Sequence, residues 1–227
     1  MKDRTVIAVD GPAGAGKSTV SRALARRLEY VYIDTGAMYR AITLMAIRRG
    51  IDPENEQGLE TLAAETQISF RFDESHGDEP NRILVNGEDV SESIRTPEVS
   101  GLVSPVSAVR GVRKVLTQQQ RELAKAGQVV MDGRDIGTTV LPQAGLKIFL
   151  TATLDERTRR RYEEMKKKGY SANFEEVKNN LAGRDAYDSG RKASPLAQAD
   201  DAVLVDTTSM SIEEVVDTLA RLHGGVI

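Results

Sequence analysis

The chain of 227 residues contains no cysteine, so disulfide bonds and thiolate zinc sites are excluded. It has no hydrophobic run long enough to cross a bilayer, and no apolar signal-peptide core near Met1. A net charge of −3 disfavours general attraction to nucleic acid or membranes. The only two histidines, His76 in a polar stretch and His223 near the end, do not resemble catalytic bases. We therefore expect a cytoplasmic globular protein that acts on small molecules.

The most informative motif is GPAGAGKS, Gly11 to Ser18, which lies between an apolar run typical of a buried strand and a segment with helical periodicity. Its glycines let successive backbone N–H groups point at phosphate oxygens, next to the positive end of the new helix. Lys17 can reach the β- and γ-phosphates, and the Ser18 hydroxyl can ligate Mg²⁺. A glycine-rich turn with an accidental lysine is the alternative, but the whole context favours a nucleoside triphosphate site.

Strand and helix patterns alternate along most of the chain, which predicts an α/β fold with a parallel sheet and helices on both faces. The expected strands are 5–9, 31–33, 129–131, 147–150 and 203–205. The expected helices follow Ser18, span 37–49 and 155–168, and begin near Ser211, where Ser211 and Glu214 have the spacing of a capping box. The stretch 67–95 differs, because it alternates with period two and contains an Asn86-Gly87 turn. We interpret it as an inserted antiparallel sheet.

Two further segments directly follow predicted strands, at the carboxyl edge of a parallel sheet, where ligands bind. After the strand 129–131, Asp132 is placed to order the water shell of Mg²⁺, and Arg134 and Asp135 follow at the same edge. In the segment 34–40, Arg40 offers a fork for a phosphate. A turn with solvated charges remains the alternative for the first segment, and a helix cap followed by a surface arginine for the second.

Basic residues cluster in two places. One is the helix 155–168, where Arg157 and Arg161 are the best candidates to close over a nucleotide, although a solvated face would show the same pattern. The other is Arg184, Asp188 and Arg191, whose spacing places them on one helix face. That face is compatible with a helix salt bridge or with a nucleotide contact.

Five motifs together resemble the bacterial cytidylate (CMP) kinases, a family of nucleoside monophosphate kinases. They are IAVDGPAGAGKST (7–19), IDTGAMYR (33–40), GEDVSESIRTPEVS (87–100), MDGRDIGTTVLP (131–142) and RDAYDSGR (184–191). The resemblance covers nearly the whole chain. It implies phosphorylation of CMP and dCMP by ATP with Mg²⁺. The expected enzyme is a monomer with a P-loop fold and has no nucleic-acid or membrane partner. It also implies a core domain of 1–35 and 128–227 with a helical lid at about 155–170, and an acceptor domain of 36–127 with the insert at about 67–95.

The resemblance also implies roles for individual positions. The ATP-binding residues would be Gly11, Pro12, Ala13, Gly14, Ala15, Gly16, Lys17, Ser18, Thr19 and Arg157. The CMP-binding residues would be Thr35, Arg40, Ser104, Arg113, Arg134, Asp135, Arg184, Asp188 and Arg191. Catalysis would depend on Lys17, Arg134, Arg40, Arg191 and Arg161, and Mg²⁺ would bind Ser18 directly and Asp132 through water. The family often has serine at the position of Thr35, a change that keeps the hydroxyl.

Two other classes share the phosphate loop. A shikimate- or gluconate-type kinase would not need a cytosine-reading trio of Ser104, Arg113 and Asp135. A GTPase-type switch would carry an Asn-Lys-x-Asp guanine signature, which this chain lacks. Arginines directed at a second phosphate favour phosphoryl transfer over switching.

Overall fold

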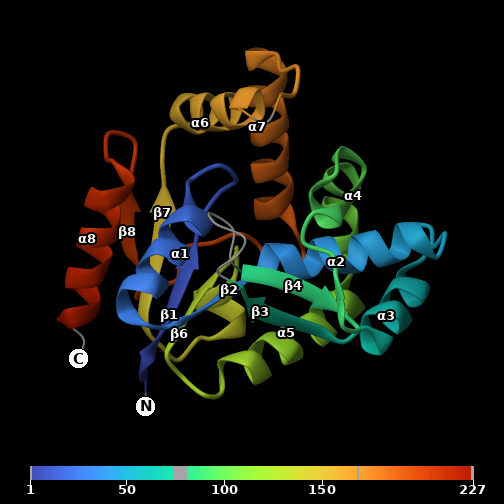
Figure 1. The fold of residues 1–227 in the computed structure, drawn as a ribbon, viewed down its shortest axis with the longest axis horizontal. Helices are drawn as coiled ribbons and strands as arrows, with labels where there is room; N and C mark the ends of the chain where they lie inside the picture. Colours follow the sequence, from blue (N-terminus) through green and yellow to red (C-terminus); the bar gives the residue numbers. More distant parts are fainter. Residues whose placement is uncertain (1, 74–80, 168, 226–227) are drawn as a thin grey trace. The chain divides into compact units, whose positions relative to one another are not determined.

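The computed structural model describes residues 2–73, 81–167 and 169–225, and these residues form two compact units (Figure 1). Unit 1 consists of Met1–Tyr32 and Ala126–Ile227, and unit 2 of Ile33–Lys125. Residues 74–80 of the expected insert, with His76 among them, and Lys168 of the basic segment lie outside the described residues. The division into a core domain with a lid and an acceptor domain concerns function, and it stays a prediction.

A five-stranded parallel sheet organises unit 1, which confirms the expected fold class. Its strand order is β2-β6-β1-β7-β8. The strands are β1 (Asp3–Asp10), β2 (Val31–Asp34), β6 (Val129–Asp132), β7 (Ala144–Thr151) and β8 (Val203–Asp206). The central strand β1 is buried from Val6 onward, because it has a neighbour on each edge and packed side chains on each face.

Two helices, α1 (Lys17–Leu28) and α8 (Ile212–Gly224), pack together over one face of this sheet (Figure 1). Leu24 of α1 and Leu219 of α8 are fully buried in the shared core. The α8 helix begins with the expected capping box, in which Ser211 and Glu214 each bind the other's backbone N–H. His223 is buried in α8 with its Nε2 3.1 Å from the Tyr30 hydroxyl, so its role is structural.

Three more elements complete unit 1. A π-helical turn, η3 (Ile136–Val140), follows β6 and contacts β1 and β7. The helices α6 (Leu154–Lys167) and α7 (Phe174–Gly190) pack against each other (Figure 1). Between them a small apolar cluster forms around Val177 and Leu181, and it includes Ala13 of the phosphate loop. The loop is thus supported by α6 and α7 as well as by the sheet.

Unit 2 is mainly helical and carries the separate antiparallel sheet β3-β4-β5 (Figure 1). Its elements are α2 (Thr35–Arg48), α3 (Glu56–Glu65), β3 (Ile68–Phe72), β4 (Asn81–Val85), β5 (Glu88–Asp89), η2 (Ser93–Arg95), α4 (Pro97–Ala108) and α5 (Arg110–Ala124). The two-residue turn between β4 and β5 has positive φ at Asn86 (51°) and Gly87 (87°), as a type I′ hairpin requires. The expected antiparallel insert is therefore confirmed. Among the described residues, no helix is both long and apolar enough to span a bilayer.

Candidate functional site

The phosphate-loop motif links β1 to α1 in unit 1, and glycine is required at its first position. A Cβ on Gly11 would lie only 2.0 Å from the Leu150 carbonyl oxygen, so the loop passes directly over β7. Gly14 (φ 75°) and Gly16 (φ 89°) adopt left-handed conformations, and Gly16 caps α1 without a side chain. The free N–H groups at the start of α1 therefore belong to a loop shaped for an anion.

Lys17 is the centre of a group of buried charges. Its Nζ donates to the Pro12 carbonyl at 2.8 Å, and only 6% of the residue is exposed. Burial lowers the pKa of Lys17 to about 7; the nearby charges of Arg134 and Arg184 lower it further, while Asp132 and Asp10 oppose the shift. A bound phosphate would favour the charged form of Lys17 and so raise its pKa again.

Ser18 and Asp132 provide oxygen atoms side by side. The Ser18 hydroxyl donates to Asp132 Oδ2 at 2.9 Å, and the Tyr32 hydroxyl donates to Asp132 Oδ1 at 3.0 Å. Hydroxyl and carboxylate oxygens are the donors that Mg²⁺ prefers, and this ion usually completes its shell with water and phosphate. The described residues contain no group of three or more His, Cys, Asp or Glu side chains placed to hold a metal alone. The pair fits a Mg²⁺ ion that is shared with a nucleotide.

Asp10, which the sequence argument did not single out, connects the end of β1 to the segment after β6. Its two carboxylate oxygens accept from the N–H groups of Ile136 and Gly137, both at 2.8 Å. Burial raises its pKa to about 6, the two backbone bonds act in the opposite direction, and Asp135 adds to the rise. Asp10 therefore fixes the backbone next to Asp135. A signal was present in the sequence, since Asp10 directly precedes Gly11 at the end of a buried strand.

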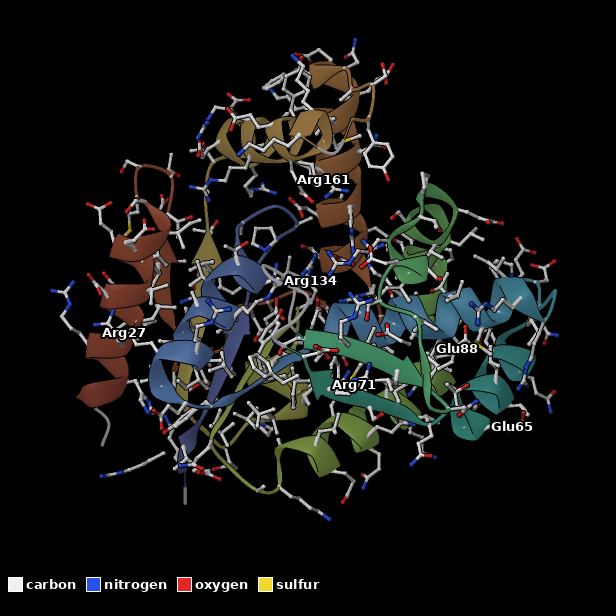
Figure 2. All side chains as sticks on the ribbon, in the orientation of Figure 1. Arg27, Glu65, Arg71, Glu88, Arg134 and Arg161 are labelled. Carbon is white, nitrogen blue, oxygen red and sulfur yellow. The ribbon has the colours of Figure 1, made fainter. Side chains whose placement is uncertain are left out.

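The DGRD segment and the end of α7 meet through Asp188. Arg134 Nε donates to Asp188 Oδ2 at 2.8 Å, and Arg191 Nη1 lies 3.7 Å from Asp188 Oδ1 (Arg134 is labelled in Figure 2). Asp188 is 4% exposed, so it is a buried carboxylate shared by two arginines. Asp188 and Arg191 thus form the expected salt bridge, although Arg191 follows the last residue of α7 and does not lie on a helix face. A nucleotide contact of these residues stays a prediction.

The two arginines expected to close over a nucleotide have different surroundings. Arg157 is buried and donates to the carbonyls of Ala152 (3.0 Å) and Ala13 (2.9 Å). Arg161, labelled in Figure 2, lies on α6 with 43% of its side chain exposed, and it pairs with Glu164 at 2.8 Å. Arg157 therefore supports the phosphate loop through the Ala13 carbonyl, whereas Arg161 has the exposure that a closing arginine needs.

In unit 2, Arg40 and Arg113 are held by neighbouring helices. Arg40 Nη1 donates to the Ser100 hydroxyl at 2.9 Å. Arg113 is buried, donates to the Ser107 carbonyl at 3.1 Å, and stacks over the Tyr39 ring at 5.2 Å. Contacts within unit 2 therefore fix the orientation of both side chains. Sequence reasoning missed Ser100 and Tyr39, which orient them.

Three other positions in unit 2 have clear local roles. Asp34 caps α2 by accepting from the Ala37 N–H at 2.9 Å, so the cap interpretation is correct for this residue. Thr35 is buried in the first turn of α2. The Ser104 carbonyl accepts from the Ser107 hydroxyl at 2.9 Å.

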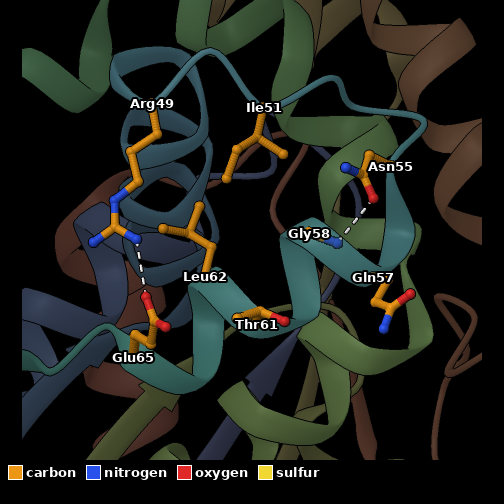
Figure 3. Close-up of a pocket in the computed structure, with 8 residues that line it drawn as sticks. All are labelled: Arg49, Ile51, Asn55, Gln57, Gly58, Thr61, Leu62 and Glu65. Carbon is orange, nitrogen blue, oxygen red and sulfur yellow. Dashed lines mark hydrogen bonds and ion pairs between the residues drawn. The ribbon is translucent and has the colours of Figure 1, made fainter.

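An open depression of about 530 Å³ lies elsewhere in unit 2 (Figure 3). Its lining includes an ion pair between Arg49 and Glu65 (2.9 Å) and the cap of α3, where Asn55 Oδ1 accepts from the Gly58 N–H. The lining contains none of the predicted site residues. The candidate site is therefore argued from the charged groups above and not from this depression.

Comparison with known proteins agrees with the motifs. The family model "Cytidylate kinase" matches residues 7–223. A cytidylate kinase of Carboxydothermus hydrogenoformans is 52% identical over 218 residues, which are 96% of each chain. One from Bacillus cereus is 50% identical over 226 residues, which are 100% of this chain and 99% of that one. An uncharacterised protein from Eubacterium ventriosum shares the fold, with a TM-score of 0.50 and 11% identity over 96% of this chain and 98% of that one.

The family match spans both compact units, and half of the residues are identical to those of full-length relatives. The chain is thus a phosphotransferase with a P-loop, and it belongs to the cytidylate kinase family.

Proposed function

We propose that this enzyme transfers the γ-phosphoryl group of ATP to CMP or dCMP, giving ADP and CDP or dCDP, with Mg²⁺. The observation that carries the proposal is the geometry of the phosphate loop. The buried Lys17 Nζ donates to the Pro12 carbonyl at 2.8 Å, and the Ser18 hydroxyl donates to Asp132 at 2.9 Å, beside the N–H groups at the start of α1. A triphosphate with Mg²⁺ complements this set of groups.

We assign the nucleoside triphosphate to the phosphate loop. The N–H groups at the start of α1 would receive the phosphate oxygens, and Lys17 would leave the Pro12 carbonyl to follow the transferred group. Ser18 and Asp132 would hold Mg²⁺, Asp132 through water, and the ion would supply positive charge that neutralises the phosphates. The proposed step is an in-line displacement.

In that step an oxygen of the CMP phosphate forms the new bond to the γ-phosphorus. The bond from this phosphorus to the β,γ-bridging oxygen breaks, and ADP leaves with the electron pair. The CMP phosphate is already ionised and nucleophilic, so no residue has to remove a proton. This explains why a protein without a histidine suited to act as a base can carry out the reaction.

Acceptor roles are assigned to residues of each unit. In unit 1, Arg134 and Arg191 would grip the acceptor phosphate, Arg184 and Asp188 the ribose, and Asp135 would accept from the cytosine amine. The position of Asp135 is favourable, because Asp10 fixes the two N–H groups that follow it.

In unit 2, Arg40 would bind the acceptor phosphate, and Thr35 would lie at the same site. Ser104 and Arg113 would complete recognition of the base. A cytosine presents an amine donor and ring acceptors, which a carboxylate and a guanidinium complement.

Product identification tests the proposal. Purified enzyme is incubated with ATP, Mg²⁺ and CMP, and the nucleotides are separated by anion-exchange chromatography. We expect ADP and CDP in equal amounts, and ADP with dCDP when dCMP is the acceptor. Formation of ADP at the same rate without any acceptor would show a hydrolase and overturn the proposal, as would the absence of CDP.

A further inference from the structure

Both backbone polar groups of Ala13 in the phosphate loop, its N–H and its carbonyl, form hydrogen bonds with side chains. The Ala13 N–H donates to Asp185 Oδ1 of α7 at 2.9 Å. The Ala13 carbonyl accepts from Arg157 Nη1 of α6 at 2.9 Å. Arg157 and Asp185 also form an ion pair with each other. One residue of the loop is thus held by a closed triangle of polar contacts from two helices far away in sequence.

Two corners of this triangle, Ala13 and Arg157, are buried, and the Asp185 side chain is 18% exposed. Arg157 is 8% exposed, and its Nε is held separately by the Ala152 carbonyl. Ala13 itself packs in the apolar cluster with Val177 and Leu181. A Cβ on Gly14 would lie 3.3 Å from Arg157 Cβ, so the next residue of the loop also approaches α6 closely. The loop cannot shift without breaking charged hydrogen bonds in a low dielectric.

The triangle contains a negative and a positive charge, Asp185 and Arg157, next to a loop that is expected to bind an anion. An aspartate beside a polyphosphate site is electrostatically unfavourable by itself, and Arg157 neutralises it. The pair therefore offers a strong acceptor for the Ala13 N–H without adding net negative charge near the anion. Ala13 is the one position of the loop whose N–H is occupied by a side chain among the hydrogen bonds of the described residues.

We infer that Asp185, neutralised by Arg157, is a positioning residue for ATP: it fixes the phosphate loop through Ala13 and couples α6 and α7 to the bound triphosphate. Asp185 touches the loop backbone and no reacting atom. Its removal lets the loop at Ala13–Gly14 relax, so the N–H groups that follow lose their aim at phosphate oxygens. This inference rests on the proposed function for the assignment of ATP to the phosphate loop, and it does not depend on the acceptor, because ATP binding can be measured without one.

The test compares three variants with the parent enzyme. Asp185→Ala removes the acceptor and the charge. Asp185→Asn keeps one oxygen for the Ala13 N–H. Lys178→Ala is the matched control, because Lys178 binds Asp155 at 2.7 Å and so links α7 to α6 without contacting the loop. The Kd for Mg-ATP is measured by calorimetry in the absence of acceptor, with Tm as a check on folding, and KM is then measured for ATP and CMP separately.

We expect Asp185→Ala to raise the Kd and KM for ATP about tenfold, the loss of roughly one hydrogen bond, with the KM for CMP nearly unchanged. Asp185→Asn should recover most of the ATP affinity, and Lys178→Ala should behave like the parent enzyme. If Asp185→Ala lowers Tm but binds ATP normally, or if ATP and CMP weaken equally, Asp185 is only structural and the inference is wrong. If Asp185→Ala does not fold, Asp185→Asn is compared with a further variant, Arg157→Lys. A Kd for ATP that is higher in Arg157→Lys than in Asp185→Asn supports the triangle. Parent-like Kd values in both variants overturn it. A parent enzyme that binds ATP yet fails to phosphorylate CMP would contradict the proposed function alone.

Discussion

Asp10→Asn is the substitution for which the structure predicts the clearest pH dependence. Asp10 is 4% exposed, and both of its carboxylate oxygens accept from backbone N–H groups at 2.8 Å. Burial nevertheless dominates and raises the pKa of Asp10 from 3.8 to about 6. Asparagine has nearly the same shape but does not titrate, so the comparison isolates the charge.

The sign follows from linkage. A carboxyl group whose pKa is higher in the folded state contributes stability below pH 3.8, where it is protonated in both states, and this contribution is lost as the pH rises through about 6. The full loss is about 3 kcal/mol at 1.36 kcal/mol per pKa unit, of which about 2 kcal/mol falls between pH 4.5 and 6.5. Asparagine offers only one acceptor, so the variant also carries a pH-independent penalty of about 1–3 kcal/mol for the second N–H.

The assay is urea unfolding followed by circular dichroism at several pH values from 4.5 to 6.5, below the pKa of about 7 that burial gives Lys17. The free energy of unfolding of Asp10→Asn, relative to the parent protein, should rise by about 2 kcal/mol across this range. Parallel stability curves would show that Asp10 does not titrate there. A relative fall would show that the two backbone bonds outweigh burial, and either result would refute the reasoning.

Three further substitutions test the proposed roles. Lys17→Ala should lower turnover about a hundredfold or more with the fold retained, because the charge that follows the transferred group is lost; near-normal turnover in a folded variant would contradict this. Arg134→Lys should strongly reduce turnover with CMP, since an ammonium cannot replace a planar fork; parent-like kinetics would leave Arg134 as the partner of Asp188 only. Asp135→Ala should lower kcat/KM for CMP far more than for UMP, and an equal fall for both would mean that Asp135 supports the site without reading the base.

Much of unit 1 could be predicted from sequence because its signals are local. Buried parallel strands are continuous apolar runs, and the phosphate loop and the Ser211 capping box have fixed spacings. The hairpin of unit 2 was predictable for the same reason, since Asn86-Gly87 selects one turn type. In each case the residues that determine the structure are neighbours along the chain.

In unit 2 the helix expected at 37–49 is confirmed as α2 (Thr35–Arg48), whereas α3, α4 and α5 were not predicted. In α4, Pro105 lies inside the helix and β-branched valines make up its buried face, both of which weaken a helical signal. In α5, the buried face includes Arg113 and Gln120, residue types that are usually exposed, so the sequence does not show which positions are buried. In α3 the stripe is short, and it is limited to Leu59, Leu62 and Ala63. Tertiary packing, and not local preference, determines these helices.

Long-range polar contacts in the candidate site could not be predicted from the sequence either. Arg157 was expected at an exposed lid, yet it is buried against Ala13, 144 residues away. Asp185 gave no signal of its own, and the position of Asp10 at the end of a buried strand did not show what it binds, because a single acidic residue has many possible partners. Only the fold shows which backbone groups they bind.

The most direct test of the central claim is a comparison of acceptors with one enzyme preparation. The kcat/KM is measured with saturating Mg-ATP and each of CMP, dCMP, UMP and AMP, with ADP formation followed by a coupled assay. We predict efficient phosphorylation of CMP and dCMP, and values lower by up to roughly ten-thousandfold for UMP and AMP, whose bases leave polar groups of the site unpaired. Equal or higher values for UMP or AMP would contradict the assignment of this protein as a cytidine nucleotide kinase.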